Sequence, residues 1–341
     1  MMIYLGGYSA GARASGASAL NAAPGTVVLA RETGAGLAVE STVDCPANPT
    51  YLALSPDRRT LYASHELDDG QLSAFAVGPG GALRLLGSRP SGGANPCHLS
   101  VHPSGRFVLT AHWGSGELAV HPVAADGALG EARHVLPTGK AAAHMIRCDP
   151  SGRWVLAVHL GLGTVTTYRL DQGTGRLDAH AVTTLPPTSG PRHLAFDPTD
   201  AGRAYVVNEL HSTLTAAAFD PDTGRLAAGV TVSTLPAGVE TANHPSAVLV
   251  SPDGRHVYVA NRFHDSVAVF AASPRLRLLA TYPCGGDFPR DMALAASRLY
   301  VANERSGAVV GFAVDPADGS LTPSGAPLAM PGPACVLPLE P

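Results

Sequence analysis

The chain has 341 residues, of which 45% are apolar and 15% charged, with a formal net charge of −4. This length fits two average domains or one large all-β domain, and the apolar content excludes a disordered chain. The slightly acidic balance argues against a nucleic-acid partner, because nucleic-acid-binding domains usually carry a basic surface. No stretch approaches the roughly 20 apolar residues of a membrane-spanning helix, so no membrane association is expected.

Five cysteines lie far apart in the sequence, without a Cys-x-x-Cys pair. An odd number of cysteines in a long chain favours reduced thiols over a disulfide framework, so we predict a cytoplasmic protein. We expect a monomer or a weak homo-oligomer.

A short apolar segment recurs seven times along the chain, usually just after a proline. In chain order its copies start at Pro49, Pro96, Ala142, Pro191, Pro245, Pro289 and Pro333. A turn such as Ser55-Pro56-Asp57 closes many of the copies, and a second apolar segment such as 61–66 follows. Third and fourth segments complete each unit, the fourth often beginning near a Gly-x-Leu.

Four short strands in each unit of about 40–50 residues are typical of a β-propeller. The first strand of the seventh unit lies at the C-terminus and its other strands lie at the N-terminus. We therefore predict an all-β fold, in which residues 1–341 form a single seven-bladed β-propeller with four antiparallel strands per blade, closed by terminal strands that share one blade. The expected blades span roughly 46–91, 92–138, 139–188, 189–240, 241–284, 285–330, and 331–341 with 1–45. Two packed β-sandwiches are the alternative, but they do not explain seven copies in register.

Polar side chains gather in two columns of the repeat, at the start of the first strand and the end of the second. These two strands form an antiparallel hairpin, so both columns should meet at one mouth of the central channel. Six of the 14 histidines fall in the columns, whereas the opposite strand ends carry ordinary turn residues. This asymmetry predicts a binding site for a small anionic molecule. Alternatively, the groups satisfy one another around a water-filled channel.

Several segments resemble the lactonase family of seven-bladed propellers, which includes bacterial 6-phosphogluconolactonases and fungal 3-carboxy-cis,cis-muconate cyclases. The similar segments are Gly190-Pro-Arg-His-Leu-Ala-Phe-Asp-Pro, Tyr205-Val-Val-Asn-Glu-Leu, Tyr258-Val-Ala-Asn-Arg and His264-Asp-Ser-Val-Ala-Val-Phe. The similarity runs from Ile3 to about Leu321. Residue by residue, it implies a catalytic group of His144, Arg192, Glu209 and Arg262, all of which fall in the two columns.

The chain departs from the family pattern at several positions near this group. Ala142 replaces the first histidine of a His-x-His, Ala247 and Leu249 replace a Glu-x-His, Asp291 replaces a histidine after Arg290, and Glu304 replaces a Gln or Asn. The scaffold is therefore retained while the pocket lining differs. We expect the other polar side chains of the columns to bind substrate: His98, His112, His159, His193, Asn208, Asn261, Arg290, Asp291, Glu304, Tyr51 and Tyr8.

Lactone hydrolysis needs an activated water, a stabilised oxyanion and a proton for the leaving alkoxide. His144 or Glu209 suits the general base, and Arg192 and Arg262 suit an oxyanion or a substrate carboxylate or phosphate. The alternative role for Glu209 is only to orient Arg192 through a salt bridge. We therefore predict a lactone hydrolase acting on a small anionic lactone of the 6-phosphogluconolactone type.

Two further functions fit the same residues. Run in reverse, the group suits a cycloisomerase of the carboxymuconate type or a biosynthetic cyclase or isomerase. A non-catalytic propeller that binds a ligand or another protein is the second alternative, although it does not explain a polar mouth. No cofactor and no metal are expected, since His-x-His and HExxH spacings are absent. The alternative is a metal held by His98, His112, His144 and His159.

Overall fold

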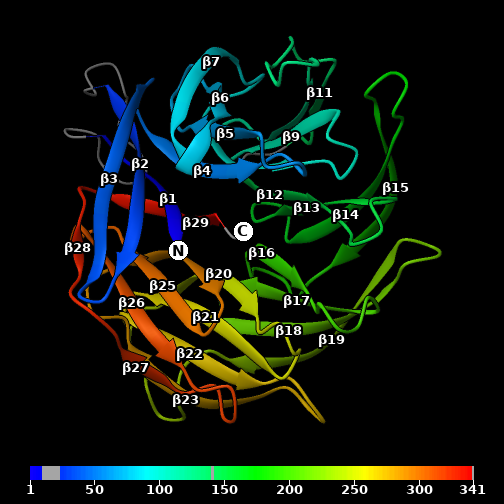
Figure 1. The fold of residues 1–341 in the computed structure, drawn as a ribbon. Coiled ribbons are helices and arrows are strands. Elements are labelled where there is room, and N and C mark those ends of the chain that lie inside the picture. Colours follow the sequence, from blue (N-terminus) through cyan, green and yellow to red (C-terminus); the bar gives the residue numbers. More distant parts are fainter. Residues whose placement is uncertain (10–23, 140–141, 340–341) are drawn as a thin grey trace.

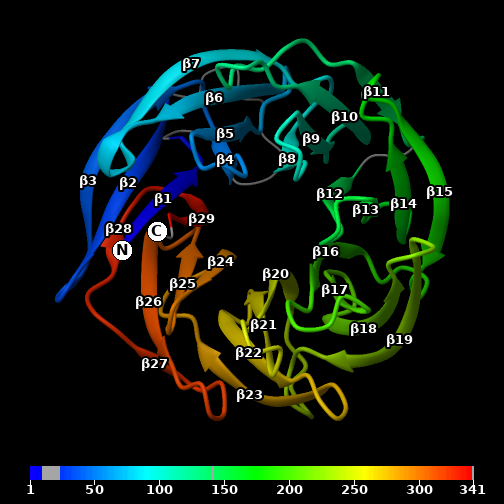
Figure 2. The same cartoon turned by 45° about the vertical axis from the view of Figure 1, so that its right-hand side comes forward.

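The computed structural model describes residues 1–9, 24–139 and 142–339. Seven antiparallel sheets are arranged in a ring around a common centre, and each sheet is one blade of a propeller (Figures 1 and 2). The predicted all-β, seven-bladed fold is confirmed. In each blade the first strand lies nearest the centre, and the following strands lie progressively outward.

The strands of the first six blades follow the repeat in chain order. Blade 1 comprises β4 (Pro49–Leu54), β5 (Thr60–His65), β6 (Gln71–Val77) and β7 (Leu83–Pro90), with a 3₁₀ turn, η1 (Pro79–Gly81), before β7. Blade 2 comprises β8 (Pro96–Val101), β9 (Phe107–His112), β10 (Glu117–Pro122) and β11 (His134–Pro137). Blade 3 comprises β12 (Ala143–Cys148), β13 (Val155–His159), β14 (Thr164–Leu170) and β15 (Leu177–Thr184). Blade 4 comprises β16 (Pro191–Phe196), β17 (Arg203–Asn208), β18 (Thr213–Asp220) and β19 (Arg225–Ser233).

Blades 5 and 6 continue the ring, and the outer edge of blade 6 is divided. Blade 5 comprises β20 (His244–Val250), β21 (His256–Arg262), β22 (Ser266–Ala271) and β23 (Arg277–Pro283). Blade 6 comprises β24 (Pro289–Ala295), β25 (Arg298–Asn303), β26 (Ala308–Val314), β27 (Leu321–Pro323) and β28 (Leu328–Ala329). Both β27 and β28 pair with β26, so together they take the place of a single fourth strand.

Blade 7 joins the two ends of the chain. Its inner strand is β29 (Pro333–Leu339), and β1 (Met2–Gly7), β2 (Gly25–Thr33) and β3 (Gly36–Cys45) follow outward. The antiparallel register runs from Met2 opposite Leu339 to Gly7 opposite Pro333. This pairing closes the ring as the repeat predicts, and it removes the two sheet edges that an open ring would expose.

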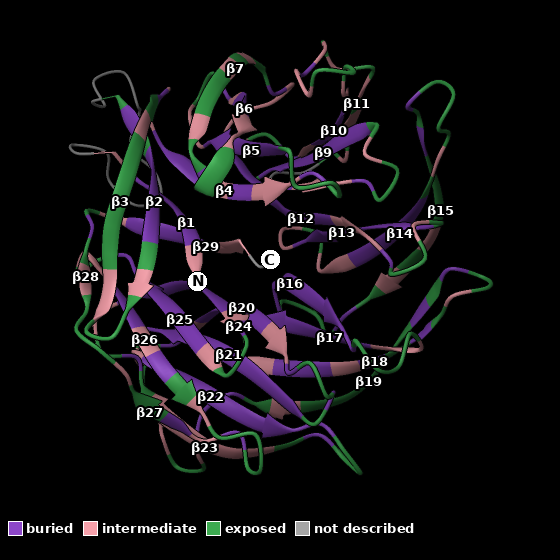
Figure 3. Cartoon of the chain, in the orientation of Figure 1, coloured by how far each residue is buried: buried purple, intermediate pink, exposed green. Residues whose placement is uncertain are grey.

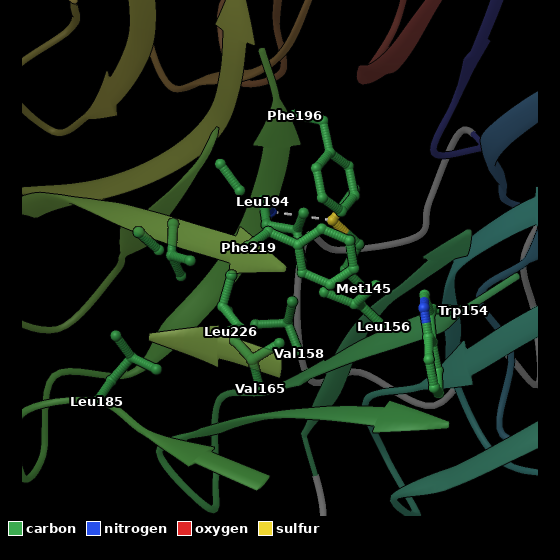
Figure 4. Packing of buried hydrophobic residues seen from close by; sticks show 13 residues of the cluster. Met145, Trp154, Leu156, Val158, Val165, Leu185, Leu194, Phe196, Phe219 and Leu226 are labelled. Atoms are coloured by element: carbon green, nitrogen blue, oxygen red, sulfur yellow. Dashed lines mark hydrogen bonds between the residues drawn. The ribbon is translucent and has the colours of Figure 1, made fainter. Parts of the chain in front are cut away.

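The hydrophobic core is divided among the gaps between blades. Each pair of neighbouring blades shares one cluster of buried apolar side chains, and there are seven such clusters. Figure 4 shows the cluster between blades 3 and 4, where Met145 and Leu156 face Leu194 and Phe219. The second strands are buried on both faces, which explains their continuous apolar runs, whereas the outermost strands are largely exposed (Figure 3).

In blades 1 and 5 the same serine–aspartate turn joins the inner strand to the second strand. Ser55 Oγ donates to Asp57 Oδ1 at 2.6 Å, and Ser251 Oγ makes the same 2.6 Å contact with Asp253. The residue after each aspartate has a positive φ, 59° at Arg58 and 70° at Gly254. These tight turns fix the hairpins whose opposite ends carry the polar columns.

Candidate active site

Every inner strand begins with a β-bulge, and the bulges place the polar side chains. In blade 4, Pro191 pairs with Asn208 and His193 pairs with Val207, so Arg192 is the extra residue. A bulge re-aims the side chain that it carries. Arg290 is the extra residue in blade 6, and His144 is the extra residue in blade 3. Starting the third copy of the repeat at Ala142 makes His144 equivalent to His98 and His193. The structure shows that this alignment is wrong by one residue, because the equivalents of His144 are Arg192 and Arg290.

Glu209 lies between two arginines from neighbouring blades. Its Oε2 lies 3.2 Å from Arg192 Nε and 2.8 Å from Arg262 Nη2. The contact with Arg192 is an ion pair without hydrogen-bond alignment. Arg192 is the second residue of β16, Glu209 follows β17, and Arg262 ends β21. Three of the four residues implied by the family resemblance therefore meet in one buried cluster.

Backbone carbonyls of blade 5 fix both guanidinium groups. Arg192 Nη1 donates to Ser246 O at 2.6 Å, and Arg262 Nε donates to His244 O at 2.8 Å. His244 Nδ1 lies 3.7 Å from the second carboxylate oxygen of Glu209. The His244 side chain is 43% exposed while that of Arg192 is 3% exposed, so solvent reaches the cluster from the His244 side.

A second cluster surrounds Arg290. It has two carboxylates and one guanidinium, whereas the first cluster has two guanidinium groups and one carboxylate. Arg290 Nη2 lies 3.2 Å from Glu66 Oε2, and Nη1 lies 3.3 Å from Glu304 Oε2. Tyr8 Oη donates to Glu66 Oε2 at 2.8 Å, and its ring centroid lies 5.0 Å from the Arg290 guanidinium carbon. Among the described residues, neither carboxylate oxygen of Glu304 has a hydrogen-bond partner, although the residue is only 5% exposed.

A chain of ring contacts runs between the inner strands. The ring centroids of His144 and His193 lie 5.2 Å apart, those of His193 and His98 5.6 Å, and those of His98 and Tyr51 4.2 Å. Asp291 is also buried here and accepts a hydrogen bond from Val336 N at 3.0 Å. The structure therefore brings His144, His193, His98 and Tyr51 together as one group.

The surrounding charges set the ionisation of the two candidate bases. Burial, and then the charges of Arg192, Arg290 and Arg262, hold the pKa of His144 well below its usual value, so the imidazole is neutral at pH 7. Burial opposes ionisation of Glu209, but Arg262 and Arg192 outweigh it and lower the pKa of this carboxyl. Glu209 is therefore an ionised, paired carboxylate, and His144 is the group that can accept a proton.

Asp291 and Glu304 differ from Glu209, because their pKa values are raised. Burial raises the pKa of Asp291 to about 6. Burial also raises the pKa of Glu304, and the charge of Glu66 adds to this effect while Arg290 opposes it. Both side chains are therefore easier to protonate than an exposed carboxyl.

Four residues expected at the mouth are buried, and three of them hydrogen-bond to the next strand of their blade or to the segment before the blade, so their contact with substrate stays a prediction. His112 bonds Ser91 Oγ at 3.0 Å and Glu117 O at 2.9 Å, and Asn208 donates to Thr213 and Thr215 at 3.0 and 2.9 Å. Asn261 likewise donates to Thr234 O and Ser266 Oγ, while His159 is 1% exposed without a hydrogen-bond partner among the described residues. Successive side chains of a strand point in opposite directions. The last residue of a second strand, such as Asn208, therefore points away from the central channel, and the next residue, such as Glu209, points toward it.

Sequence analysis left Glu66 and His244 out of the site. Glu66 follows His65 as Glu209 follows Asn208 and as Glu304 follows Asn303, so its repeat position was the available signal. His244 carried no such signal, because it precedes the proline that begins the repeat and reaches Glu209 through folding.

The described residues contain no group of three His, Cys, Asp or Glu side chains arranged to hold a metal ion. Among these residues, His98, His112, His144 and His159 therefore do not form the four-histidine metal site of the alternative. Among the same residues, no helix is long and apolar enough to cross a membrane.

Comparisons with known proteins cover almost the whole chain. Residues 2–338 match the family described as "Lactonase, 7-bladed beta-propeller". The 6-phosphogluconolactonase of Bacillus subtilis is 35% identical over 305 residues, which cover 85% of this chain and 86% of that protein. The enzyme of the same name from Pectobacterium carotovorum is 30% identical over 70% of each chain. The solved structure of the Pseudomonas aeruginosa periplasmic gluconolactonase matches 99% of each chain with a TM-score of 0.86 and 27% identity.

Proposed function

Because the chain belongs to the lactonase family of seven-bladed β-propellers, we propose that it hydrolyses a small anionic lactone of the 6-phosphogluconolactone type. The observation that carries this proposal is the meeting of Arg192, Glu209 and Arg262. Arg192 Nη1 lies 3.4 Å from His193 Nε2, and the His193 ring centroid lies 5.2 Å from that of His144. That the protein is an enzyme follows from its relationship to lactone hydrolases. Its cytoplasmic location remains a prediction, since one relative is described as periplasmic.

The cationic cluster is suited to the acidic group of the substrate. Arg192 and Arg262 share a single carboxylate, so this side of the site carries an excess positive charge. Guanidinium groups bind carboxylate and phosphate oxygens in a bidentate manner, and those held by backbone carbonyls lose little freedom on binding. Glu209 acts here as a positioning residue, because its carboxylate already forms ion pairs with both arginines.

The reaction itself assigns His144 as general base. A water molecule gives a proton to the neutral imidazole and attacks the lactone carbonyl, and the oxyanion that forms lies against Arg192. The ring C–O bond then breaks, and the protonated imidazole returns the proton to the leaving alkoxide oxygen. Anionic substrate also offsets the arginine charges that lower the pKa of His144, which makes the imidazole a stronger base in the complex.

The cluster around Arg290 supports a hydroxylated substrate. Glu304 presents two buried oxygens without hydrogen-bond donors among the described residues, and Glu66 lies across the same arginine. Sugar hydroxyls supply donors of this kind, whereas the hydrocarbon backbone of a muconate does not. This difference favours the sugar lactone over the cycloisomerase substrate.

The test compares three compounds with the purified protein. Hydrolysis of 6-phosphoglucono-1,5-lactone and of glucono-1,5-lactone is followed by acid release at constant pH, with the spontaneous rate subtracted. We expect kcat/KM for the phosphorylated lactone to be at least about tenfold higher, because one charge-assisted contact separates the two compounds. Lactone hydrolysis no faster than the spontaneous rate would contradict the proposal, as would conversion of 3-carboxymuconate in preference to both lactones.

A further inference from the structure

A cavity of about 880 Å³ lies at the other end of the inner strands. It is lined by the last residues of these strands and by the turns that follow, among them Leu54, Val101 and Phe196. In contrast, Arg192 lies at the start of β16, and Glu209 lies just after the end of β17. The cavity is therefore separate from the candidate active site and approaches it only at Tyr51 and His98.

Arg147 brings a positive charge into this cavity without an acidic partner. It lies near the end of β12 and lines the cavity, where its Nη1 donates to Leu194 O at 3.4 Å. Its guanidinium carbon lies 5.9 Å from the ring centroid of Phe196. Among the described residues, no carboxylate lies within 4.0 Å of this guanidinium, in contrast to Arg192, Arg262 and Arg290.

The two acids that line the cavity are engaged in turns. Asp149 accepts hydrogen bonds from Ser151 Oγ at 2.6 Å and from Trp154 N at 2.8 Å. Asp197 accepts a hydrogen bond from Thr199 Oγ1 at 2.8 Å. Neither aspartate therefore neutralises Arg147.

An unpaired guanidinium in a partly buried site retains strong affinity for an anion. The group has five N–H donors, and among the described residues one of these donors contacts an acceptor, the carbonyl of Leu194. Burying such a charge is unfavourable unless a partner of opposite charge accompanies it. The phenol of Tyr51 lines the same cavity and supplies a further donor.

We propose that this end of the channel binds a small oxyanion, either a carboxylate or a phosphate group of a solute, between Arg147 and Tyr51. The site adjoins the candidate active site at Tyr51, whose ring contacts His98, but its arginine is separate from Arg192, Arg262 and Arg290. The proposal does not depend on the lactonase proposal. Its planar guanidinium suits a two-oxygen contact, and Phe196 holds one face of the group.

The test is a calorimetric titration of the full-length protein with inorganic phosphate and, separately, with benzoate. The variants are Arg147→Met, which keeps an aliphatic stem, Arg192→Met in the candidate active site, and Arg84→Met on the exposed surface as control. In Arg192→Met, which removes anion binding at the candidate active site, we expect one saturable site for at least one of the two anions. Its affinity should fall at least about tenfold when Arg147→Met is added, and should not change when Arg84→Met is added instead.

Two results would overturn the proposal. They are saturable binding to Arg192→Met that the added Arg147→Met substitution leaves intact, and the absence of saturable binding of either anion to Arg192→Met. If Arg147→Met does not fold, arginine modification by phenylglyoxal is mapped on the wild-type protein by mass spectrometry. Protection of Arg147 by the anion, with Arg84 unprotected, then supports the site, and equal labelling of Arg147 with and without anion contradicts it.

Discussion

Arg192 and Glu209 stand at adjacent ends of one hairpin and form a buried ion pair of 3.2 Å between Nε and Oε2. The pairing needs the β-bulge at Arg192, which turns this side chain out of the regular alternation of β16. It also needs Glu209 to lie just beyond β17, on the opposite side from Asn208. The local geometry of blade 4 thus positions the carboxylate of Glu209, and Arg262 of blade 5 forms a second ion pair with it.

Replacing Arg192 with methionine should remove oxyanion stabilisation and one of the two substrate-facing charges. We expect kcat/KM for the phosphorylated lactone to fall by at least about a hundredfold, as for other losses of an oxyanion donor. Steady-state kinetics measure the effect, with Arg84→Met as the matched control on an exposed arginine. A near-normal rate in Arg192→Met would refute the assignment of this residue.

Replacing Glu209 with glutamine should leave two buried arginines without their shared counter-ion. Breaking a buried pair from one side typically costs about 3–5 kcal/mol, so the free energy of unfolding in urea should fall by about this amount. Glu40→Gln is the control, because its pair with Arg31 at 2.8 Å is exposed and should contribute less than about 1 kcal/mol. Equal losses in the two variants would show that the shared carboxylate has no special structural role.

The pH dependence of kcat/KM should reveal the ionisation of His144. Its folded pKa lies well below 6.5, so the imidazole remains neutral, and active as a base, as the pH falls through 6.5. We therefore expect the acid limb of the profile to have its midpoint below pH 6.5. Asp291, with a pKa of about 6, could produce a similar limb, so the profile is also measured in Asp291→Asn. A limb that disappears in this variant would assign the titration to Asp291 and contradict the role given to His144.

Glu304 should destabilise the folded protein when it is ionised. Its folded pKa is raised, so the folded state binds the proton more tightly than the unfolded state, and stability falls as the pH rises from about 4.5 through the folded pKa. Glu304→Gln should raise Tm by about 2 °C at pH 8 and leave it nearly unchanged at pH 4. Glu131→Gln, at a side chain that is 78% exposed, is the control for scanning calorimetry. A gain at pH 4 as large as that at pH 8 would contradict this account.

The repeat made the fold predictable, because seven similar apolar patterns require seven similar sheets and the placement of the seventh unit requires closure. It also placed Arg192, Glu209 and Arg262 near one another, since equivalent positions of equivalent blades face the same centre. It could not place Asn208 or His112, because one residue of difference at a strand end decides between the sheet and the centre. It also misaligned His144, because a bulge adds a residue that the apolar pattern does not reveal.

Arg147 and His244 lay beyond such reasoning for a different reason. Arg147 is a single arginine in an apolar strand, and only the coordinates distinguish a paired charge from an unpaired one. His244 reaches Glu209 from the neighbouring blade. Contacts between side chains of neighbouring blades depend on the angle between the two sheets, and the repeat pattern of the sequence does not predict this angle.

Blade 7 also has a consequence for the order in which the enzyme becomes functional. Glu66 in blade 1 and Arg290 in blade 6 are 224 residues apart, and they face each other across the seam where β29 pairs with β1. This contact therefore requires the closed ring, so we expect the charged pocket to assemble only after β29 has paired with β1.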